Sequence, residues 1–183
     1  MSNYLDYNAS TPIDSRVLDV MIDAFQNRYG NADSRTHEFG ESARRIVEDS
    51  RGNIAKLLNV KKDEVFFTSG ATESDNISIL GLQEYAEHTS KKHIITTAIE
   101  HKAVLEPLSA LEAKGFEVTY IKPDKSGRIN PDEVLSNVRD DTLLVSVMHT
   151  NNETGVIQPI DVIGEALDNT CLLYTSPSPR DRQ

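Results

Sequence analysis

Short apolar runs of strand length alternate with helix-like segments through most of the chain, and this alternation limits the possible fold more than any other feature. The apolar runs are rich in β-forming residues and occupy positions 93–97, 117–121 and 143–148. The segments between and after them predict helices at 103–114, at 131–138 and from Pro159 onward. Such alternation is typical of a mainly parallel sheet with helices on both faces, so we expect the α/β fold class.

One more strand is expected in the stretch VFFTSGATESDN, which covers positions 65–76. The apolar run at 65–67 leads into a polar turn with Gly70, and a helix is expected to continue to about Tyr85. A glycine turn before a helix presents main-chain N–H groups and the positive end of the helix dipole, which favour an anion such as phosphate. Because turns of this composition most often only cap helices, the stretch by itself does not establish a phosphate site.

The first 60 residues predict helices without strands. Asp14 or Ser15 is expected to cap a helix that runs to about Arg28, and a longer second helix is expected to end near Leu58. We therefore divide the chain into four parts: an arm at 1–14, helices at 15–60, a partial sheet domain at 61–170 and a tail at 171–183.

Polar residues follow the expected strands at the carboxyl ends, where open α/β sheets bind ligands. The TSGAT turn follows the first strand, and His101 follows the strand at 93–97. Two amides, Asn151 and Asn152, follow the strand at 143–148. We expect these groups to lie near one edge of the sheet. A helix-capping histidine and a plain polar turn are the alternative interpretations.

Composition and charge argue against several classes of function. The chain has 183 residues, of which 38% are hydrophobic and 26% charged, and its formal net charge is −10. An acidic chain without a Lys/Arg cluster is not expected to bind nucleic acid. It has no apolar run of membrane-spanning length and no signal-peptide pattern at its start, so we expect a cytoplasmic protein with no membrane partner. Cys171 is the single cysteine, which excludes an internal disulfide, and we expect no metal.

The final residues, CLLYTSPSPRDRQ from Cys171 onward, break the helical pattern that precedes them. They can be interpreted as a disordered Ser/Pro-rich tail. The interpretation that we favour is an in-frame translation of a sequencing adapter, which would place the end of the native sequence near Thr170. Residues 171–183 are accordingly excluded from the expected fold.

Four motifs together carry a resemblance to a known family: YLDYNASTP, TSGATESDN, HIITTAIEHKAVLEPL and VSVMHTNNETGVIQPI. In this order and spacing they resemble the N-terminal half of a cysteine desulfurase of the housekeeping and nitrogenase-associated type, within the class V aminotransferases. The resemblance covers residues 4–170. It implies that residues 61–170 are a truncated part of the pyridoxal 5'-phosphate-binding large domain, with the aspartate aminotransferase-like fold type I of such transferases.

The resemblance also implies an activity and its partners. The implied enzyme is a homodimer that converts L-cysteine to L-alanine. Its sulfur is retained as an enzyme persulfide and passed to an iron-sulfur scaffold or another acceptor protein.

The resemblance assigns roles to individual residues. Ala71 and Thr72 match the turn that binds the cofactor's phosphate through a main-chain N–H and a hydroxyl. His101 matches the catalytic histidine that stacks on the pyridine ring and moves protons. Asn152 matches the amide that hydrogen-bonds the phenolic oxygen. The cofactor-binding set implied by the resemblance is therefore Ala71, Thr72, His101 and Asn152.

Other residues are weaker candidates or are interpreted as structural. Asn8 and Ala9 match positions near the substrate, and His88 and His93 are interpreted as structural. Ala32 stands where the family usually has proline, and we expect little effect.

Several family features have no counterpart in this sequence. They are the Schiff-base lysine, the aspartate and glutamine that contact the ring, the substrate-carboxylate arginine and the catalytic cysteine. Lys102 does not occupy the Schiff-base position, and Cys171 matches no family cysteine. We therefore expect the chain to be an inactive N-terminal fragment.

Two other functions remain open at this stage. Another class V member, such as a selenocysteine lyase or a carbon-sulfur lyase, would share all four motifs. A non-catalytic interaction module could retain the same fold without the chemistry.

Overall fold

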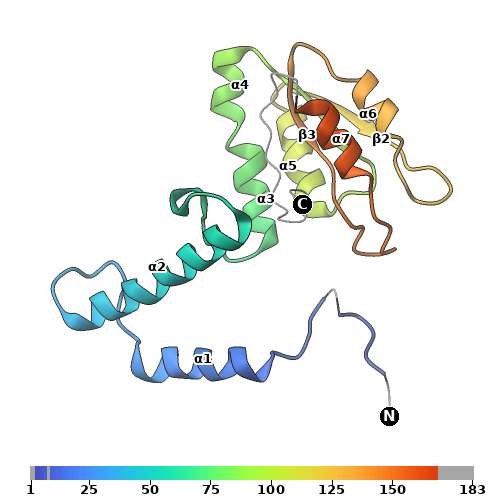
Figure 1. The fold of residues 1–183 in the computed structure, drawn as a ribbon. Coiled ribbons are helices and arrows are strands. Elements are labelled where there is room, and N and C mark those ends of the chain that lie inside the picture. The colour runs from blue at the N-terminus through green and yellow to red at the C-terminus, as the bar shows by residue number, and fades with distance from the viewer. Residues whose placement is uncertain (1–2, 8, 169–183) are drawn as a thin grey trace. The chain divides into compact units, whose positions relative to one another are not determined.

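The computed structural model describes residues 3–7 and 9–168, and the chain divides into two compact units, Met1–Phe67 and Thr68–Gln183 (Figure 1). The first candidate substrate residue, Asn8, and the proposed adapter-derived tail from Cys171 lie outside the described residues. The tail assignment therefore remains a prediction.

The first unit consists of helices, as expected. Helix α1 spans Ser15–Asn27, and the Asp14 carboxylate caps it by accepting a hydrogen bond from the Arg16 N–H at 2.9 Å. Helix α2 spans Glu38–Leu58, and a short 3-10 helix, η1, spans Lys62–Glu64. Both predicted helices and the Asp14 cap are confirmed. No residue of α1 is buried among the described residues.

The turn before α2 is held by hydrogen bonds from the side chain of Arg44 to main-chain carbonyls. Arg44 donates hydrogen bonds from Nε to the Ala32 carbonyl at 2.9 Å and from Nη2 to the Ser34 carbonyl at 2.7 Å. Ala32 takes part through its carbonyl oxygen, which alanine and proline share.

The predicted strand at 65–67 does not form. Val65 is buried and extended, with φ −103° and ψ 118°, but Phe66 and Phe67 are 79% and 50% exposed. Strands need a neighbouring strand to pair their main-chain groups, and no described strand pairs with this segment. Arg51 supplies contacts instead, because its Nη1 donates to the Val65 carbonyl and its guanidinium lies 5.0 Å from the Phe67 ring centroid.

The second unit contains the parallel sheet that the sequence predicts. Strands β1 (His93–Thr97), β2 (Glu117–Ile121) and β3 (Thr142–Ser146) form a three-stranded sheet in the order β2-β1-β3. Both pairings of β1 are parallel. The central strand is β1, and its five residues are all buried.

Helices cover both faces of this sheet (Figure 1). Adjacent residues of β1 point to opposite faces, so Ile94 and Ile95 belong to two separate core clusters. The cluster with Ile94 includes residues from α3 (Ala71–Leu80), α4 (Gln83–Thr89) and α5 (Lys102–Glu112). The cluster with Ile95 includes residues from α6 (Pro131–Ser136) and α7 (Ile160–Leu167). The expected α/β architecture is confirmed.

Glycine residues mark two helix boundaries. The predicted helix after the TSGAT turn is interrupted at Gly81, where a Cβ atom would lie 2.4 Å from the Ile77 carbonyl oxygen. The helix predicted at 103–114 is closed at Gly115, which has a φ of +88°, as glycine permits. The Phe116 N–H then bonds to the Leu111 carbonyl at 3.1 Å. Among the described residues, no helix has both the length and the apolar character that a membrane span requires.

Candidate functional site

The candidate site lies at the carboxyl ends of β1 and β3. These strands are parallel neighbours, and Thr96 is paired with Ser146 near their ends. The chain then runs from β1 through Glu100 to His101, and from β3 into the loop at 149–158. Parallel pairing therefore brings the predicted histidine segment and the predicted amide segment to the same edge of the sheet.

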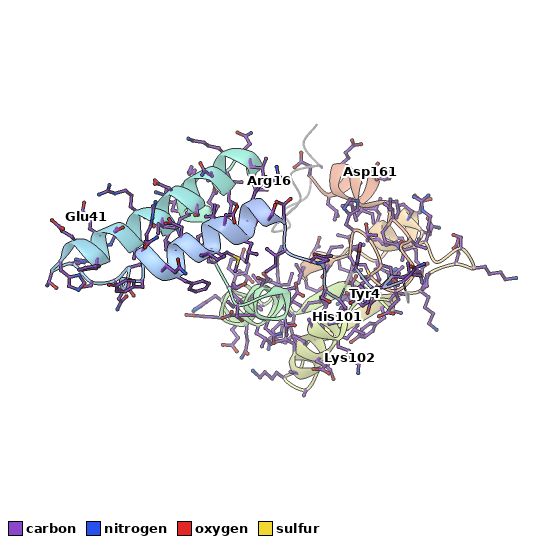
Figure 2. The ribbon with its side chains drawn as sticks, turned by 90° about the horizontal axis from the view of Figure 1, so that it is seen from below. Tyr4, Arg16, Glu41, His101, Lys102 and Asp161 are labelled. Carbon is purple, nitrogen blue, oxygen red and sulfur yellow. The ribbon has the colours of Figure 1, made fainter. Side chains whose placement is uncertain are left out.

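His101, which is labelled in Figure 2, is the residue that precedes α5. It is exposed. Its Nδ1 atom accepts a hydrogen bond from the Ala103 N–H at 3.1 Å and thereby caps the helix. In a neutral ring with Nδ1 as acceptor, Nε2 carries the proton. The capping interpretation of this histidine is thus correct, and it leaves Nε2 able to contact a ligand.

The loop after β3 is organised by Asn151, a residue to which the sequence analysis gave no separate role. Its Oδ1 atom accepts hydrogen bonds from the main-chain N–H groups of Glu153 and Thr154, at 3.0 and 2.9 Å. Its Nδ2 donates to the Ile99 carbonyl at 3.1 Å, and the residue is 7% exposed. An asparagine that bonds the backbone two and three residues ahead is a common turn device, so the NNETG sequence did carry this signal.

Asn152 has a different environment. Its side chain is exposed, and Nδ2 donates to Glu153 Oε1 at 2.9 Å. Of the two adjacent amides, Asn151 holds the loop in place and Asn152 is on its surface.

The TSGAT turn and the start of the following helix form as predicted. Helix α3 begins at Ala71, directly after Gly70, and both Ala71 and Thr72 are exposed in its first turn. The turn is held by a hydrogen bond of 2.7 Å between Thr68 Oγ1 and Ser74 Oγ. The first turn of α3 therefore offers main-chain N–H groups and the Thr72 hydroxyl beside the positive end of the helix.

A carboxylate already contacts this turn. The Ser69 N–H donates to Glu73 Oε2 at 2.5 Å, and this hydrogen bond lowers the pKa of Glu73. The turn thus stabilises negative charge from its own chain, as expected of main-chain N–H groups near a helix start.

Two carboxyl groups lie close to the histidine segment and were missed by the sequence analysis. Glu100 is 8% exposed, and its Oε1 accepts hydrogen bonds from Thr97 Oγ1 and from the Met148 N–H, both at 2.8 Å. Burial raises the pKa of Glu100. Burial also raises the pKa of Asp75 on α3, while the charge of His101 acts in the opposite direction. Helix α3 packs against α5, and Asp75 lies within electrostatic range of both His101 and Glu100.

The structure does not place every candidate in this site. Ala9 belongs to the first unit, where its N–H bonds to Asp6, and it is exposed. Lys102 is exposed at the start of α5. His93 is buried within the sheet, between Thr142 Oγ1 at 2.8 Å and Thr119 Oγ1 at 2.9 Å.

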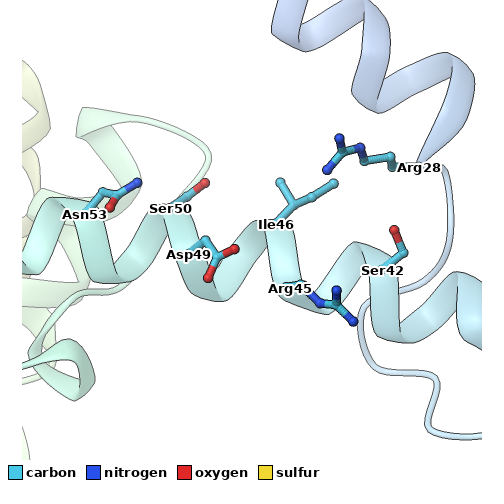
Figure 3. Close-up of a pocket in the computed structure, with 7 residues that line it drawn as sticks. All are labelled: Arg28, Ser42, Arg45, Ile46, Asp49, Ser50 and Asn53. Carbon is cyan, nitrogen blue, oxygen red and sulfur yellow. The ribbon is translucent and has the colours of Figure 1, made fainter.

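Two surface hollows lie elsewhere. One, of about 260 Å³, runs along α2 and is shown in Figure 3; its lining residues are Arg28, Ser42, Arg45, Ile46, Asp49, Ser50 and Asn53. The other, of about 630 Å³, lies beside the loop that follows β2 and includes Lys122 and Arg128. Neither is lined by a candidate site residue, so the candidate site is defined by its donor groups and its place in the sheet.

The fold is that of a parallel α/β protein in which an imidazole and an amide follow neighbouring strands at their carboxyl ends. The TSGAT turn, which follows no strand among the described residues, leads into α3. The family model described as "Aminotransferase class-V" matches residues 3–175, and the chain belongs to this family. The resemblance found from the four motifs is thereby confirmed.

Its relatives include named cysteine desulfurases. "Cysteine desulfurase IscS" of Anaeromyxobacter sp. (strain K) is 49% identical over 161 residues, which cover 88% of this chain and 40% of the relative. The chain thus spans well under half of this relative's length. Among solved structures, DndA from Streptomyces lividans has a TM-score of 0.83 and 48% identity, with 98% of this chain and 52% of that chain covered. The structure described as "SspA in complex with cysteine" has a TM-score of 0.84 and 38% identity, with 91% and 48% covered.

Proposed function

We propose that the chain is the N-terminal part of a pyridoxal-phosphate-dependent cysteine desulfurase, which converts L-cysteine to L-alanine and retains the sulfur as a persulfide. The observation that carries this proposal is a pair of hydrogen bonds, Met148 to Glu100 and Asn151 to Ile99. They connect the segment that leads to His101 with the loop that contains Asn152. Named cysteine desulfurases among the relatives support the same reaction. A related structure described as a complex with cysteine supports the substrate.

The donor set fits pyridoxal phosphate. The phosphate would accept hydrogen bonds from the Ala71 N–H and the Thr72 hydroxyl, in the first turn of α3, where the helix dipole favours an anion. The Asn152 amide would donate to the phenolic oxygen. When bound, the cofactor supplies a ring that accepts electrons from the substrate carbon.

His101 would support the ring and move a proton. Its Nδ1 atom is held by the Ala103 N–H, so Nε2 is the atom at which a proton is taken or released. The capping hydrogen bond fixes the His101 imidazole relative to the start of α5. The imidazole therefore has fewer orientations in which it can meet a ligand. This is the orienting contribution that a protein makes to cofactor chemistry.

The proposed activity belongs to a longer protein. No residue of this sequence matches the Schiff-base lysine or the catalytic cysteine of the family, so the chain alone is proposed to be inactive. The longer protein is proposed to be a cytoplasmic homodimer that delivers sulfur to an iron-sulfur scaffold or another acceptor protein.

The first test is the source DNA downstream of the codon for Thr170. We expect an open frame that encodes a Ser-x-His-Lys stretch and a cysteine-bearing loop. The protein encoded by the whole frame should release alanine from L-cysteine in amounts matched by persulfide or sulfide. A frame without the lysine and the cysteine would contradict the proposal.

The same experiment separates the alternatives, which the named relatives do not favour. A strong preference for L-selenocysteine over L-cysteine would indicate a selenocysteine lyase. A genuine stop codon near Gln183 in independent reads would indicate a non-catalytic module.

A further inference from the structure

A buried carboxyl group joins the two loops of the candidate site. Oε1 of Glu100, in the turn after β1, accepts a hydrogen bond from the N–H of Met148, in the segment that follows β3, at 2.8 Å. The same atom accepts a hydrogen bond from Thr97 Oγ1 at 2.8 Å, and Thr97 itself is fully buried. Oε1 of Glu100 thus accepts one hydrogen bond from the end of β1 and one from the segment that follows β3.

A second hydrogen bond crosses between the same loops in the opposite direction. Asn151, in the loop after β3, donates from Nδ2 to the carbonyl of Ile99, which directly precedes Glu100. Each loop therefore sends one side chain to the main chain of the other. These two bonds restrict how far the loops can move apart.

The identity of the residue at position 100 is informative because a carboxyl group is a costly choice for a buried position. An apolar side chain would fill the space without loss of hydration, whereas a buried polar group must be hydrogen-bonded to be tolerated. Among the described residues, Glu100 meets that condition through Thr97 of β1 and Met148, which follows β3. Asp75 on α3 is a second acidic group within electrostatic range. Glu100 is therefore placed to hold loops together rather than to fill the core.

We propose that Glu100 is a positioning residue, whose Oε1 fixes the turn that carries His101 relative to the loop that carries Asn152. This inference rests on the proposed function, since it assumes that both side chains contact pyridoxal phosphate. Glu100 itself makes no contact with the cofactor in this account. Its effect is exerted through the two residues that it holds in place.

The test compares three variants of the full-length protein obtained from the extended reading frame. Glu100→Gln retains an acceptor oxygen at the same position, whereas Glu100→Ala removes it and leaves the Thr97 and Met148 donors without this partner. Glu106→Ala is the matched control, because Glu106 is an exposed acidic residue of α5 outside the site. Pyridoxal phosphate is the probe, and its dissociation constant is measured by titration of its visible circular dichroism band.

Glu100→Ala is expected to weaken cofactor binding about tenfold, because the buried Thr97 hydroxyl and the half-buried Met148 N–H lose their acceptor and the two loops lose this connection. Glu100→Gln and Glu106→Ala are expected to have dissociation constants for pyridoxal phosphate within about twofold of the parent's. The first keeps the acceptor oxygen, and the second leaves the site unchanged. Amide hydrogen exchange gives a readout without cofactor. In Glu100→Ala, the amides of Met148 and of residues 151–155 should exchange faster, while those of β2 should not.

Each other outcome overturns the inference. Binding by Glu100→Ala that equals the parent would show that the loops keep their positions without this bond. A Glu100→Gln variant as weak as Glu100→Ala would exclude a role based on the acceptor. A parent protein that binds no pyridoxal phosphate would overturn the proposed function and this inference together. The first two outcomes would overturn only the role of Glu100.

Discussion

The side-chain amide of Asn151 donates a hydrogen bond to the carbonyl of Ile99 at 3.1 Å, across 52 positions of sequence. The side-chain oxygen of Asn151, Oδ1, at the same time accepts hydrogen bonds from the N–H groups of Glu153 and Thr154. Asn151 therefore determines both the shape of its loop and the place of that loop beside β1. Asn152, the next residue, is on the surface of the loop, where a ligand could reach it.

We predict that Asn151→Ala and Asn152→Ala have different effects. Asn151→Ala should lower the free energy of unfolding by about 1–3 kcal/mol, because two main-chain N–H groups of the loop lose their acceptor and the bond to the Ile99 carbonyl is lost. Asn152→Ala should change stability by less than about 0.5 kcal/mol, since its side chain is exposed. Urea unfolding of both variants measures the difference. Equal losses would contradict the division of roles between these two residues.

Thr72 provides a test of the proposed phosphate contact. Thr72→Val removes the hydroxyl while it keeps the branched shape, and it should weaken pyridoxal phosphate binding by the full-length protein roughly tenfold. Thr72→Ser should restore most of the affinity. Ser78→Ala, at an exposed position of the same helix, is the control. If Thr72→Val binds as well as Ser78→Ala, the hydroxyl does not contact the phosphate.

His93 should make stability depend on pH. Burial, and secondarily the positive charge of Arg139, lowers the pKa of His93 below its ordinary value. The unfolded chain therefore binds the proton more readily than the folded chain, and stability should fall as pH is lowered from about 6.5 toward the folded-state pKa. Above about pH 6.5, where His93 is neutral in both states, its contribution should be constant.

A difference measurement isolates this contribution, because Glu100 acts in the opposite direction. Its raised pKa means that its contribution to stability is complete at low pH and is lost as pH rises through the folded-state value. The free energy of unfolding should be measured between about pH 5.5 and 7.5 for the parent and for His93→Gln. His88→Gln, at an exposed position, is the control. A slope in His93→Gln equal to that of the parent would contradict the prediction.

Two glycines with positive φ form a matched pair. Gly127 has a φ of +82°, and a Cβ atom there would lie 3.3 Å from Val156 Cγ2. Gly155 has a φ of +71°, with nothing within 4 Å of such an atom. Gly155→Ala should cost about 1–2 kcal/mol from backbone strain alone. Gly127→Ala should cost more, because Val156 must also shift, and thermal unfolding of the two variants measures the order. Equal costs would show that Val156 moves freely, and the reverse order would contradict the prediction.

Some elements were predictable because their causes are local. The Asp14 cap of α1, proline at the start of α6 and the closure of α5 by Gly115 each depend on residues a few positions apart. The strands at 93–97 and 117–121 were predicted to the residue. The prediction of a strand at 65–67 was wrong. These residues have the apolar pattern of a strand, but none of the described strands pairs with them.

The order of motifs in the sequence by itself determined the α/β class, the family and the segments from which the candidate site is built. Local periodicity and helix-end chemistry are sufficient for the α/β class, since they act over a few residues, and the family follows from the resemblance of the four motifs. Tertiary structure alone decided that Glu100 is buried, that Asn151 rather than Asn152 holds its loop, and that the segment leading to His101 is hydrogen-bonded to that loop. These facts depend on hydrogen bonds between strand ends about 50 residues apart, and burial of such groups follows from packing rather than from neighbours in sequence.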